Sequence, residues 1–197
     1  QFISESQGYD TYISVERIYA SLHDDILTGN DENNMIVGRA GDDVITGGVG
    51  GDWLTGDDTD QSGSDTFRYV SVDDSNMVNR DTITDFDAAN DTIFLDTMGV
   101  GTFSFIGAGV FSGSGATEAR FNDTTKLLEI DTTGSGSADM AMTLTDVDLA
   151  DLSASNFQVT SAPLANQLPI AFDNFDSTDH LTPITLWDGD FTWDDYD

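Results

Sequence analysis

The chain contains no cysteine, and lysine and arginine together account for only 6 of its 197 residues. Without cysteine it can form neither disulfides nor thiolate metal sites. Its 37 aspartate and glutamate residues give a formal net charge of −31. Six scattered basic residues cannot form a basic patch, so neither nucleic acid nor an anionic membrane surface is expected as a partner. Self-repulsion at this charge opposes compaction, so we expect bound cations to stabilise the fold.

Other absences concern targeting and catalysis. No apolar run approaches the ~18 residues needed to span a bilayer, and no N-terminal signal peptide is visible. The chain starts at Gln1, which indicates processing or a fragment of a larger protein. Its two histidines, His23 and His180, do not form the H-E-x-x-H motif of zinc proteases, and no G-x-S-x-G motif occurs. Paired carboxylates of the glycosidase kind are not excluded by counting, but metal binding and solvation explain them better, so we predict no catalytic site.

A nine-residue period runs from Ala20 to Arg68, with one insertion of about four residues in its fifth unit. The units read ASLHDDILT (20–28), GNDENNMIV (29–37), GRAGDDVIT (38–46) and GGVGGDWLT (47–55), and the fifth, starting at Gly56, closes as GSDTFR (63–68). The sixth position holds Asp25, Asn34, Asp43, Asp52 and Asp65, and the eighth holds Leu27, Ile36, Ile45, Leu54 and Phe67. A flexible Gly/Asp linker would not explain five apolar residues in register.

The spacing predicts a turn of six residues followed by a strand of three. Glycine permits positive φ in the turn, and the eighth residue points inward while the seventh and ninth point outward. Two units complete a coil of about 18 residues, and coils stack at about 4.8 Å. Calcium prefers oxygen ligands at about 2.3–2.6 Å, so an ion between stacked turns would reach both. We therefore expect the pairs Asp25/Asp43, Asn34/Asp52 and, across the insertion, Asp43/Asp65.

The repeat resembles the G-G-x-G-x-D-x-U-x pattern of RTX (repeats-in-toxin) proteins. This resemblance implies several calcium ions held by the sixth-position side chains and by turn residues. The candidate calcium ligands are Asp25, Asn34, Arg39, Gly41, Asp43, Gly48, Gly50, Asp52, Gly63 and Asp65. The loops differ in quality, because GGVGGD is near ideal, Arg39 replaces a glycine in GRAGDD, and the first two loops lack most glycines. We expect weak or absent ions in those two.

The sequence after the repeats resembles the C-terminal domain of serralysin-family secreted metalloproteases. The matching segments are GSDTFRYVSVDDS (63–75), RDTITDFDAANDTIFLD (80–96), FIGAGVFSG (105–113), ATEARF (116–121), LLEIDTTGSGSADMAMTL (127–144) and DLSASNFQVT (151–160). The resemblance implies an all-β fold: a parallel β-roll of nonapeptide repeats continuing into a β-sandwich-like C-terminal cap. It also implies type I export to the extracellular space, with the last segment similar to the family's uncleaved export signal. We divide the chain into a lead-in (1–19), the RTX roll (20–68), the cap (69–160) and an acidic tail (161–197).

Two acidic motifs in the cap region leave alternatives open. In RDTITDFDAAND, Asp81, Asp85, Asp87 and Asp91 either supply calcium oxygens or are solvated carboxylates on a strand; we name Asp85 and Asp91 as candidate ligands. In DTTGSGSAD (131–139), Thr133 and Ser135 stand where the family's pattern has carboxylates. A strong calcium site is not expected there, and weak binding by Asp131 and Asp139 stays open.

The extended acidic tail has eight aspartates and no lysine or arginine between Ile170 and Asp197. Clustered aromatic residues serve as binding anchors, so we expect Trp187, Phe191 and Trp193 to dock on another protein chain. The alternatives are a disordered end, a displaced export signal, or a tail folded back over Trp53. Trp53 is at an outward seventh position, where we expect the N-terminal segment, the tail or a partner to cover it.

Two functions follow. The first is a non-catalytic calcium-binding module that folds on extracellular calcium and serves as a structural or docking subunit of a larger secreted assembly. The second is the detached C-terminal domain of a secreted hydrolase, such as a serralysin-like metalloprotease.

Overall fold

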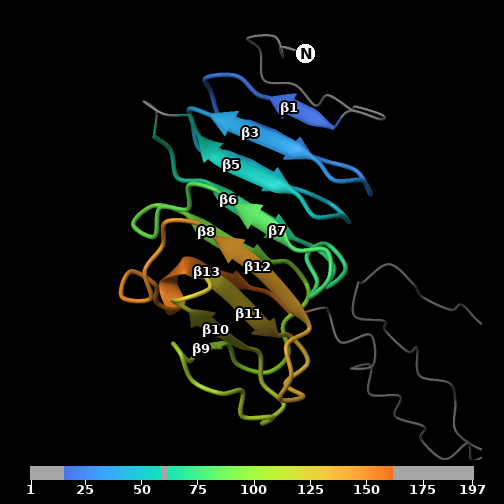
Figure 1. Ribbon diagram of the computed structural model, residues 1–197, viewed down its shortest axis with the longest axis vertical. Helices are drawn as coiled ribbons and strands as arrows, with labels where there is room; N and C mark the ends of the chain where they lie inside the picture. The colour runs from blue at the N-terminus through green and yellow to red at the C-terminus, as the bar shows by residue number, and fades with distance from the viewer. Residues whose placement is uncertain (1–15, 59–61, 162–197) are drawn as a thin grey trace, which may run out of the picture. The chain divides into compact units, whose positions relative to one another are not determined.

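The computed structural model describes residues 16–58 and 62–161, which belong to one compact unit (Figure 1). Within these residues there are thirteen β-strands and one short 3-10 helix, η1 (Ala154–Asn156). The strands are β1 (Arg17–Tyr19), β2 (Ile26–Thr28), β3 (Met35–Arg39), β4 (Val44–Thr46), β5 (Trp53–Asp57), β6 (Thr66–Tyr69), β7 (Asp81–Ile83), β8 (Thr92–Leu95), β9 (Ser104–Phe105), β10 (Glu118–Asn122), β11 (Leu127–Asp131), β12 (Met140–Leu144) and β13 (Phe157–Val159). The acidic tail and its three aromatic anchors lie outside the described residues.

Successive strands of the repeat region alternate between two sheets, and this alternation makes the roll. Strands β1, β3, β5 and β7 are parallel neighbours in an eight-stranded sheet, whereas β2, β4, β6 and β8 are parallel neighbours in a five-stranded sheet. Each glycine-rich turn reverses the chain after three to five strand residues and sends it to the opposite sheet. The expected all-β parallel β-roll is therefore confirmed.

The strand register follows the 18-residue coil deduced from the repeat. Ile26 pairs with Val44 in one sheet and Met35 pairs with Trp53 in the other. The insertion is absorbed in a turn, because Val44 still pairs with Thr66, 22 residues later. All five eighth-position residues point into the core and are 0–5% exposed. The register also extends back into the lead-in, where Arg17 pairs with Met35.

The roll passes into the cap without a break, and its parallel stacking does not stop at Arg68. Strand β7 pairs in parallel with β12, which begins the antiparallel run β12-β11-β10, and β9 closes that sheet. Strand β13 extends the other sheet by pairing with β8. One hydrophobic cluster runs from Ile18 to Phe157 through both regions. The cap is thus a continuation of the two sheets of the roll.

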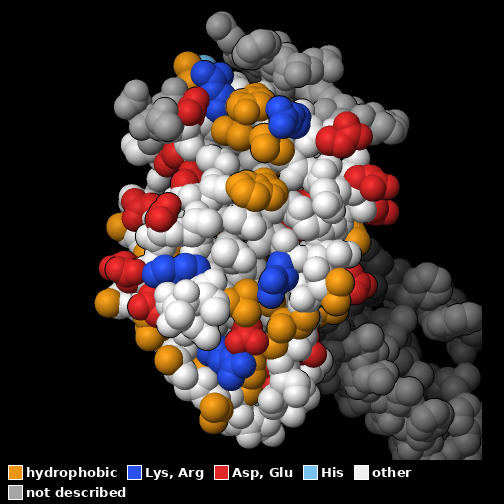
Figure 2. Space-filling model, in the orientation of Figure 1, with side chains coloured by type: hydrophobic (Ala, Val, Ile, Leu, Met, Phe, Trp, Pro, Cys, Tyr) orange, Lys and Arg blue, Asp and Glu red, His pale blue; other side chains and the backbone are white. Residues whose placement is uncertain are grey.

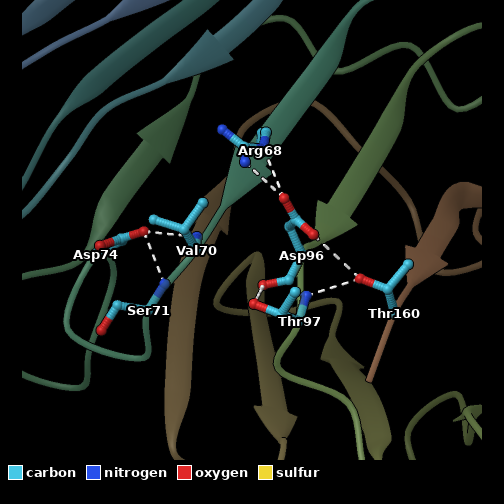
Figure 3. Close-up of polar contacts among 7 residues, drawn as sticks. All are labelled: Arg68, Val70, Ser71, Asp74, Asp96, Thr97 and Thr160. Atoms are coloured by element: carbon cyan, nitrogen blue, oxygen red, sulfur yellow. Dashed lines mark hydrogen bonds and ion pairs between the residues drawn. The ribbon is translucent and has the colours of Figure 1, made fainter. Parts of the chain in front are cut away.

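A polar latch holds the last described strand to the roll (Figure 3). Arg68 donates from Nε and Nη2 to Asp96 Oδ2, at 3.0 and 2.5 Å. The hydroxyl of Thr160 donates to Asp96 Oδ1 at 3.2 Å and accepts the amide of Thr97 at 2.7 Å. Hydrogen bonding to Arg68 lowers the pKa of Asp96. The export-signal-like segment therefore forms part of the folded sheet.

The acidic side chains of the upper part of the molecule gather along its two edges, whereas the middle of the visible face is apolar or neutral over β3 and β5 (Figure 2). Trp53 lies on β5 between Met35 and Thr82 of the neighbouring strands and is 55% exposed. No described segment covers this side chain. The N-terminal residues up to 15 and the tail lie outside the described residues, so cover by them or by a partner stays a prediction.

Candidate metal sites

The sixth-position side chains on one edge of the roll form a ladder in which each carboxylate accepts an amide of the coil before it. The amide of Asp25 donates to Asp43 Oδ1 at 2.8 Å, and the amide of Asp43 donates to Asp65 Oδ1 at 2.9 Å. The amide of Asp65 donates in turn to Asp91 Oδ1 at 3.0 Å. The structure thus brings together the expected pairs Asp25/Asp43 and Asp43/Asp65, and adds Asp91 as the next rung.

A second ladder runs along the opposite edge. The amide of Asn34 donates to Asp52 Oδ1 at 2.8 Å, and the amide of Asp52 donates to Asp81 Oδ1 at 2.9 Å. This ladder ends at Ser75, whose hydroxyl accepts the amide of Asp81 and donates to the carbonyl of Ala141 in β12. The expected pair Asn34/Asp52 is therefore present, and the ladder connects directly to the cap.

Several rungs keep their second carboxylate oxygen buried without a hydrogen-bond partner. Oδ2 of Asp43, Asp52 and Asp65 is in this state, and these residues are 0–1% exposed. Burial raises the pKa of Asp43 to about 8, that of Asp52 to about 6 and that of Asp65 to about 7. A buried polar atom without a partner is costly, and a buried charge without a counter-charge is more costly still. A cation between the coils would compensate the burial of these oxygens.

In other rungs, a side-chain oxygen accepts a hydrogen bond from the rung's own loop. The amide of Ser21 donates to Asp25 Oδ2 at 2.8 Å, and the amide of Asp87 donates to Asp91 Oδ2 at 2.8 Å. In the loop 29–34, the amide of Asn30 donates to Asn34 Oδ1 at 2.8 Å. In each case the donor lies four residues before the rung. The loops with few glycines therefore use internal hydrogen bonds where GRAGDD and GGVGGD leave an oxygen open.

Glycine at the first position of each good unit makes room for the open oxygen. A methyl group on Gly38, Gly47 or Gly56 would lie 2.1–2.2 Å from Oδ2 of Asp43, Asp52 or Asp65, respectively. Sequence reasoning omitted these three glycines from the candidate site, although their recurrence at the first position was the available signal. They contribute the space that the carboxylate occupies.

Candidate glycines in the middle of the turns pack against backbone carbonyls of the coil before them. A methyl group on Gly63 would lie 2.0 Å from the carbonyl oxygen of Gly41, and one on Gly48 would lie 2.4 Å from that of Asn30. Gly41, Gly48 and Gly50 have φ values of 113°, 97° and 147°, which a side chain rarely adopts. Arg39 stands where the repeat pattern has a glycine, and its own φ is 88°. Its Nη1 donates to the carbonyl of Ala20 at 3.4 Å.

A further acidic group lies where the second ladder meets the cap. Asp81 is fully buried, and burial, together with the charge of Asp52, raises its pKa to about 8. Asp74 is 5% exposed and accepts the amides of Val70 and Ser71 on Oδ2 (Figure 3). Its charge raises the pKa of Asp52 and Asp81. Asp81 Oδ2 and the hydroxyl of Tyr69 are both buried without a hydrogen-bond partner.

Asp74 and Tyr69 were missed by sequence reasoning because both follow the last nonapeptide unit, Tyr69 at the end of β6 and Asp74 in the irregular segment after it. Asp85, a predicted ligand, is not part of either ladder and lies beside the end of β5. Its Oδ1 accepts the amide of Gly56 at 3.0 Å and its Oδ2 accepts the amide of Asp57 at 2.6 Å. Asp85 therefore closes the end of β5, and the neighbouring Asp57 Oδ1 is buried without a partner.

The loop 131–139 in the cap satisfies its carboxylates internally. Asp131 is fully buried and accepts the amides of Ser135 at 3.0 Å and Gly136 at 2.6 Å. Asp139 Oδ2 accepts the amides of Thr132 and Thr133, at 2.9 and 3.0 Å. These backbone hydrogen bonds outweigh desolvation and lower the pKa of Asp131. That no strong calcium site forms here stays a prediction.

The carboxylate and carbonyl oxygens of the turn stacks suit a hard cation such as calcium, which takes six to eight oxygen ligands, backbone carbonyls among them. In residues 16–58 and 62–161, no three acidic or histidine side chains converge closely enough to hold a metal by themselves. An ion between two coils would therefore need carbonyl oxygens in addition to the open carboxylates. The turns supply both kinds of oxygen.

Comparison with known proteins gives a family and a set of structural likenesses. A family model described as "Peptidase M10 serralysin C terminal" matches residues 22–156. Two similar solved structures are the AlgE6R2 and AlgE6R3 subunits of a mannuronan C5-epimerase from Azotobacter vinelandii. They are 24% and 26% identical, with TM-scores of 0.45 and 0.41; the alignments cover 76% and 88% of this chain and 96% and 100% of theirs. No curated protein matches.

Proposed function

Because the chain belongs to the family of peptidase M10 serralysin C-terminal domains, we propose that it is a non-catalytic calcium-binding module. In this proposal it folds when it meets extracellular calcium after type I export. The observation that carries the proposal is the set of buried, unpartnered Oδ2 atoms of Asp43, Asp52 and Asp65 between stacked turns. In its described residues the chain has no helix long and apolar enough to span a membrane.

Three places in the turn stacks favour an ion. Asp43 and Asp65 would hold one between the turns at 38–43 and 56–65, with the carbonyl of Gly41 near the second turn. Asp52 would hold another with carbonyls of the turn at 29–34 beside it. Asp52 and Asp81, with Asp74 nearby, would hold a third where the roll meets the cap. Bound calcium supplies the positive charge that these buried carboxylates lack.

The direct test is a calcium titration of the full chain at neutral pH, starting from chelator-treated protein. We expect far-ultraviolet circular dichroism to change from a largely unfolded to a β-rich spectrum in the range of about 0.1–1 mM calcium typical of extracellular modules. Magnesium at equal concentration is the matched control, because it demands octahedral geometry and dehydrates reluctantly. A native spectrum in chelator, unchanged by calcium, would reject the proposal.

The same proposal assigns the tail a docking role. Trp187, Phe191 and Trp193 alternate with carboxylates, a pattern that suits an apolar groove rimmed by lysine and arginine on another protein. Truncation after Pro169 tests this. Docking predicts that the shortened domain keeps its calcium-dependent stability and loses its partner. A tail folded back on this domain predicts the reverse, with lower stability and retained partner binding.

The family match also supports a second candidate, the detached C-terminal domain of a secreted metalloprotease. The full-length gene decides between the two. An H-E-x-x-H motif encoded upstream in the same reading frame would identify a protease parent, whereas its absence would favour a structural or docking subunit.

A further inference from the structure

A second set of hydrogen bonds crosses the turn stacks in the direction opposite to the aspartate ladders. It is made by the side chains at the fifth position of the repeat, which the G-G-x-G-x-D-x-U-x pattern leaves unspecified. The amide of Asp42 donates to Asp24 Oδ1 at 2.9 Å, and the amide of Ser64 donates to Asp42 Oδ1 at 2.9 Å. On the other edge, the amide of Gly51 donates to Asn33 Oδ1 at 3.0 Å.

The two sets are reciprocal at each of these three turn pairs. Between the turns ending at Asp43 and Asp65, the amide of Asp43 donates to the later coil, and Asp42 accepts an amide from it. Each pair of turns is therefore joined by two bonds of opposite direction between adjacent positions. Two such bonds fix both the separation of the turns and their relative rotation, and these quantities set the space available to an ion between them.

The fifth-position bonds stop before the last pair of each stack. On one edge, the fifth-position residue is Gly51, which has no side chain to accept the amide of Arg80. On the other edge, the amide of Asn90 donates to the carbonyl of Asp87 in its own loop. The three acceptors also differ from the sixth-position rungs because they are exposed at the surface. An exposed carboxylate or amide oxygen needs no metal to compensate its burial, so these bonds can form with or without calcium.

We propose that Asp24, Asn33 and Asp42 are positioning residues for the calcium sites, each setting the spacing of two turns by accepting an amide hydrogen bond from the next coil. This inference rests on the proposed calcium function. Asn33 already fills the role with a neutral oxygen, so the acceptor is required and the negative charge is not. The proposed role therefore differs from a general electrostatic attraction of calcium by the acidic surface, which would depend on the charge.

The test compares Asp42→Asn with Asp42→Ala. Both remove the same charge, but asparagine keeps an acceptor oxygen. The calcium concentration at half-folding is measured by circular dichroism, and hydrogen exchange at the Ser64 amide is measured in saturating calcium. We expect the alanine variant to need about fivefold more calcium than the asparagine variant, as for one modest hydrogen bond. Faster exchange at Ser64 is expected in the alanine variant alone.

Asp31 provides the matched control, because it is an exposed acid in a neighbouring turn and its side chain makes no described hydrogen bond. Asp31→Asn and Asp31→Ala should have equal calcium midpoints. Asn33→Asp should resemble the wild type and Asn33→Ala should not, which repeats the comparison on the other edge. Failure of Asp42→Ala to fold at any calcium concentration, while Asp42→Asn folds, would also support the role.

Equal midpoints for Asp42→Asn and Asp42→Ala, or unchanged exchange at Ser64, would overturn the positioning role and leave the calcium function standing. A wild-type chain that ignores calcium would reject the proposed function. In that case the exchange at Ser64 still decides whether Asp42 holds the two turns together.

Discussion

The turns of the roll and the loop 131–139 of the cap both bury aspartates completely, yet the pKa values of these aspartates shift in opposite directions. Asp52 and Asp131 are each 0% exposed. Burial raises the pKa of Asp52 to about 6, whereas backbone amides lower the pKa of Asp131. The difference lies in the second oxygen, which has no partner in Asp52 and accepts an amide of its own loop in Asp131. Burial alone therefore does not make a carboxylate a metal ligand.

The same contrast occurs on a smaller scale inside the roll. Asp43 sits in a loop whose glycines leave its Oδ2 open, whereas the Oδ2 of Asp25 accepts the amide and hydroxyl of Ser21. The roll thus contains open rungs, which we propose depend on a cation, and closed rungs, which do not.

The largest effect is expected from Asp52→Ala, compared with Asn34→Ala. Asp52 contributes a buried charged oxygen, and losing a charged interaction of about 1.5–3 kcal/mol raises the calcium requirement for folding by about tenfold or more. Asn34 is neutral and its Oδ1 already accepts the amide of Asn30, so its removal should cost about 1 kcal/mol. Calorimetric calcium titrations of both variants measure the difference. Equal losses would show that open and closed rungs bind alike.

Asp131→Ala should destabilise the domain without changing the number of calcium ions that it binds. The substitution leaves the amides of Ser135 and Gly136 without their buried acceptor, at a cost of about 1–3 kcal/mol. Urea unfolding at saturating calcium gives the loss of stability, and a calorimetric calcium titration at saturation gives the number of bound ions. A loss of bound calcium ions in this variant would place a metal in the cap loop and remove the contrast.

The calcium-free protein should become more folded as the pH falls from about 8 toward 4. The raised pKa values of Asp43, Asp65 and Asp81, at about 8, 7 and 8, mean that the folded state holds protons that the unfolded chain has already lost. The free energy of unfolding therefore decreases as the pH rises through this window. Circular dichroism in chelator at a series of pH values tests the direction. Greater folding at pH 8 than at pH 5 would contradict it.

Calcium should reverse that pH dependence, because the ion competes with the protons. Its apparent affinity is expected to increase from pH 5 to pH 8, with protons released on binding. Asp131 behaves in the opposite way, since its lowered pKa contributes stability that is present at neutral pH and is lost only below about pH 4. Proton release, measured by calorimetry in buffers of different ionisation enthalpy, should be absent if the open rungs are already charged in the calcium-free fold.

The smallest effect is expected at the latch. Arg68→Gln removes the ion pair with Asp96, in which both side chains are partly exposed to solvent. Such pairs contribute about 0–1 kcal/mol, so the urea midpoint and the calcium midpoint should both shift only slightly. A large rise in the calcium requirement would show that docking of the last strand is coupled to the ion sites.

The sequence predicted the ladder wherever the nine-residue period is intact. The pairs Asp25/Asp43 and Asn34/Asp52 follow from residues 18 apart, because identical turns stack in register. The later rungs could not be predicted in this way. Asp52 meets Asp81 across 29 residues and Asp65 meets Asp91 across 26, so irregular loops of different length replace the repeat. Only the pairing of β7 and β8 with the earlier strands brings these residues into line.

The β-roll, its register and its inward-facing residues follow from the amino-acid sequence, because a repeat of nine residues fixes how each turn lies on the next. The sequence also ranked the loops, since Thr133 and Ser135 stand where carboxylates were expected near Asp131. It did not show which oxygen of Asp43 or Asp131 would lack a hydrogen-bond partner. Whether a second oxygen meets an amide of its own loop or a space between two coils depends on the path of the folded backbone, and that difference separates a candidate calcium ligand from a structural hydrogen bond.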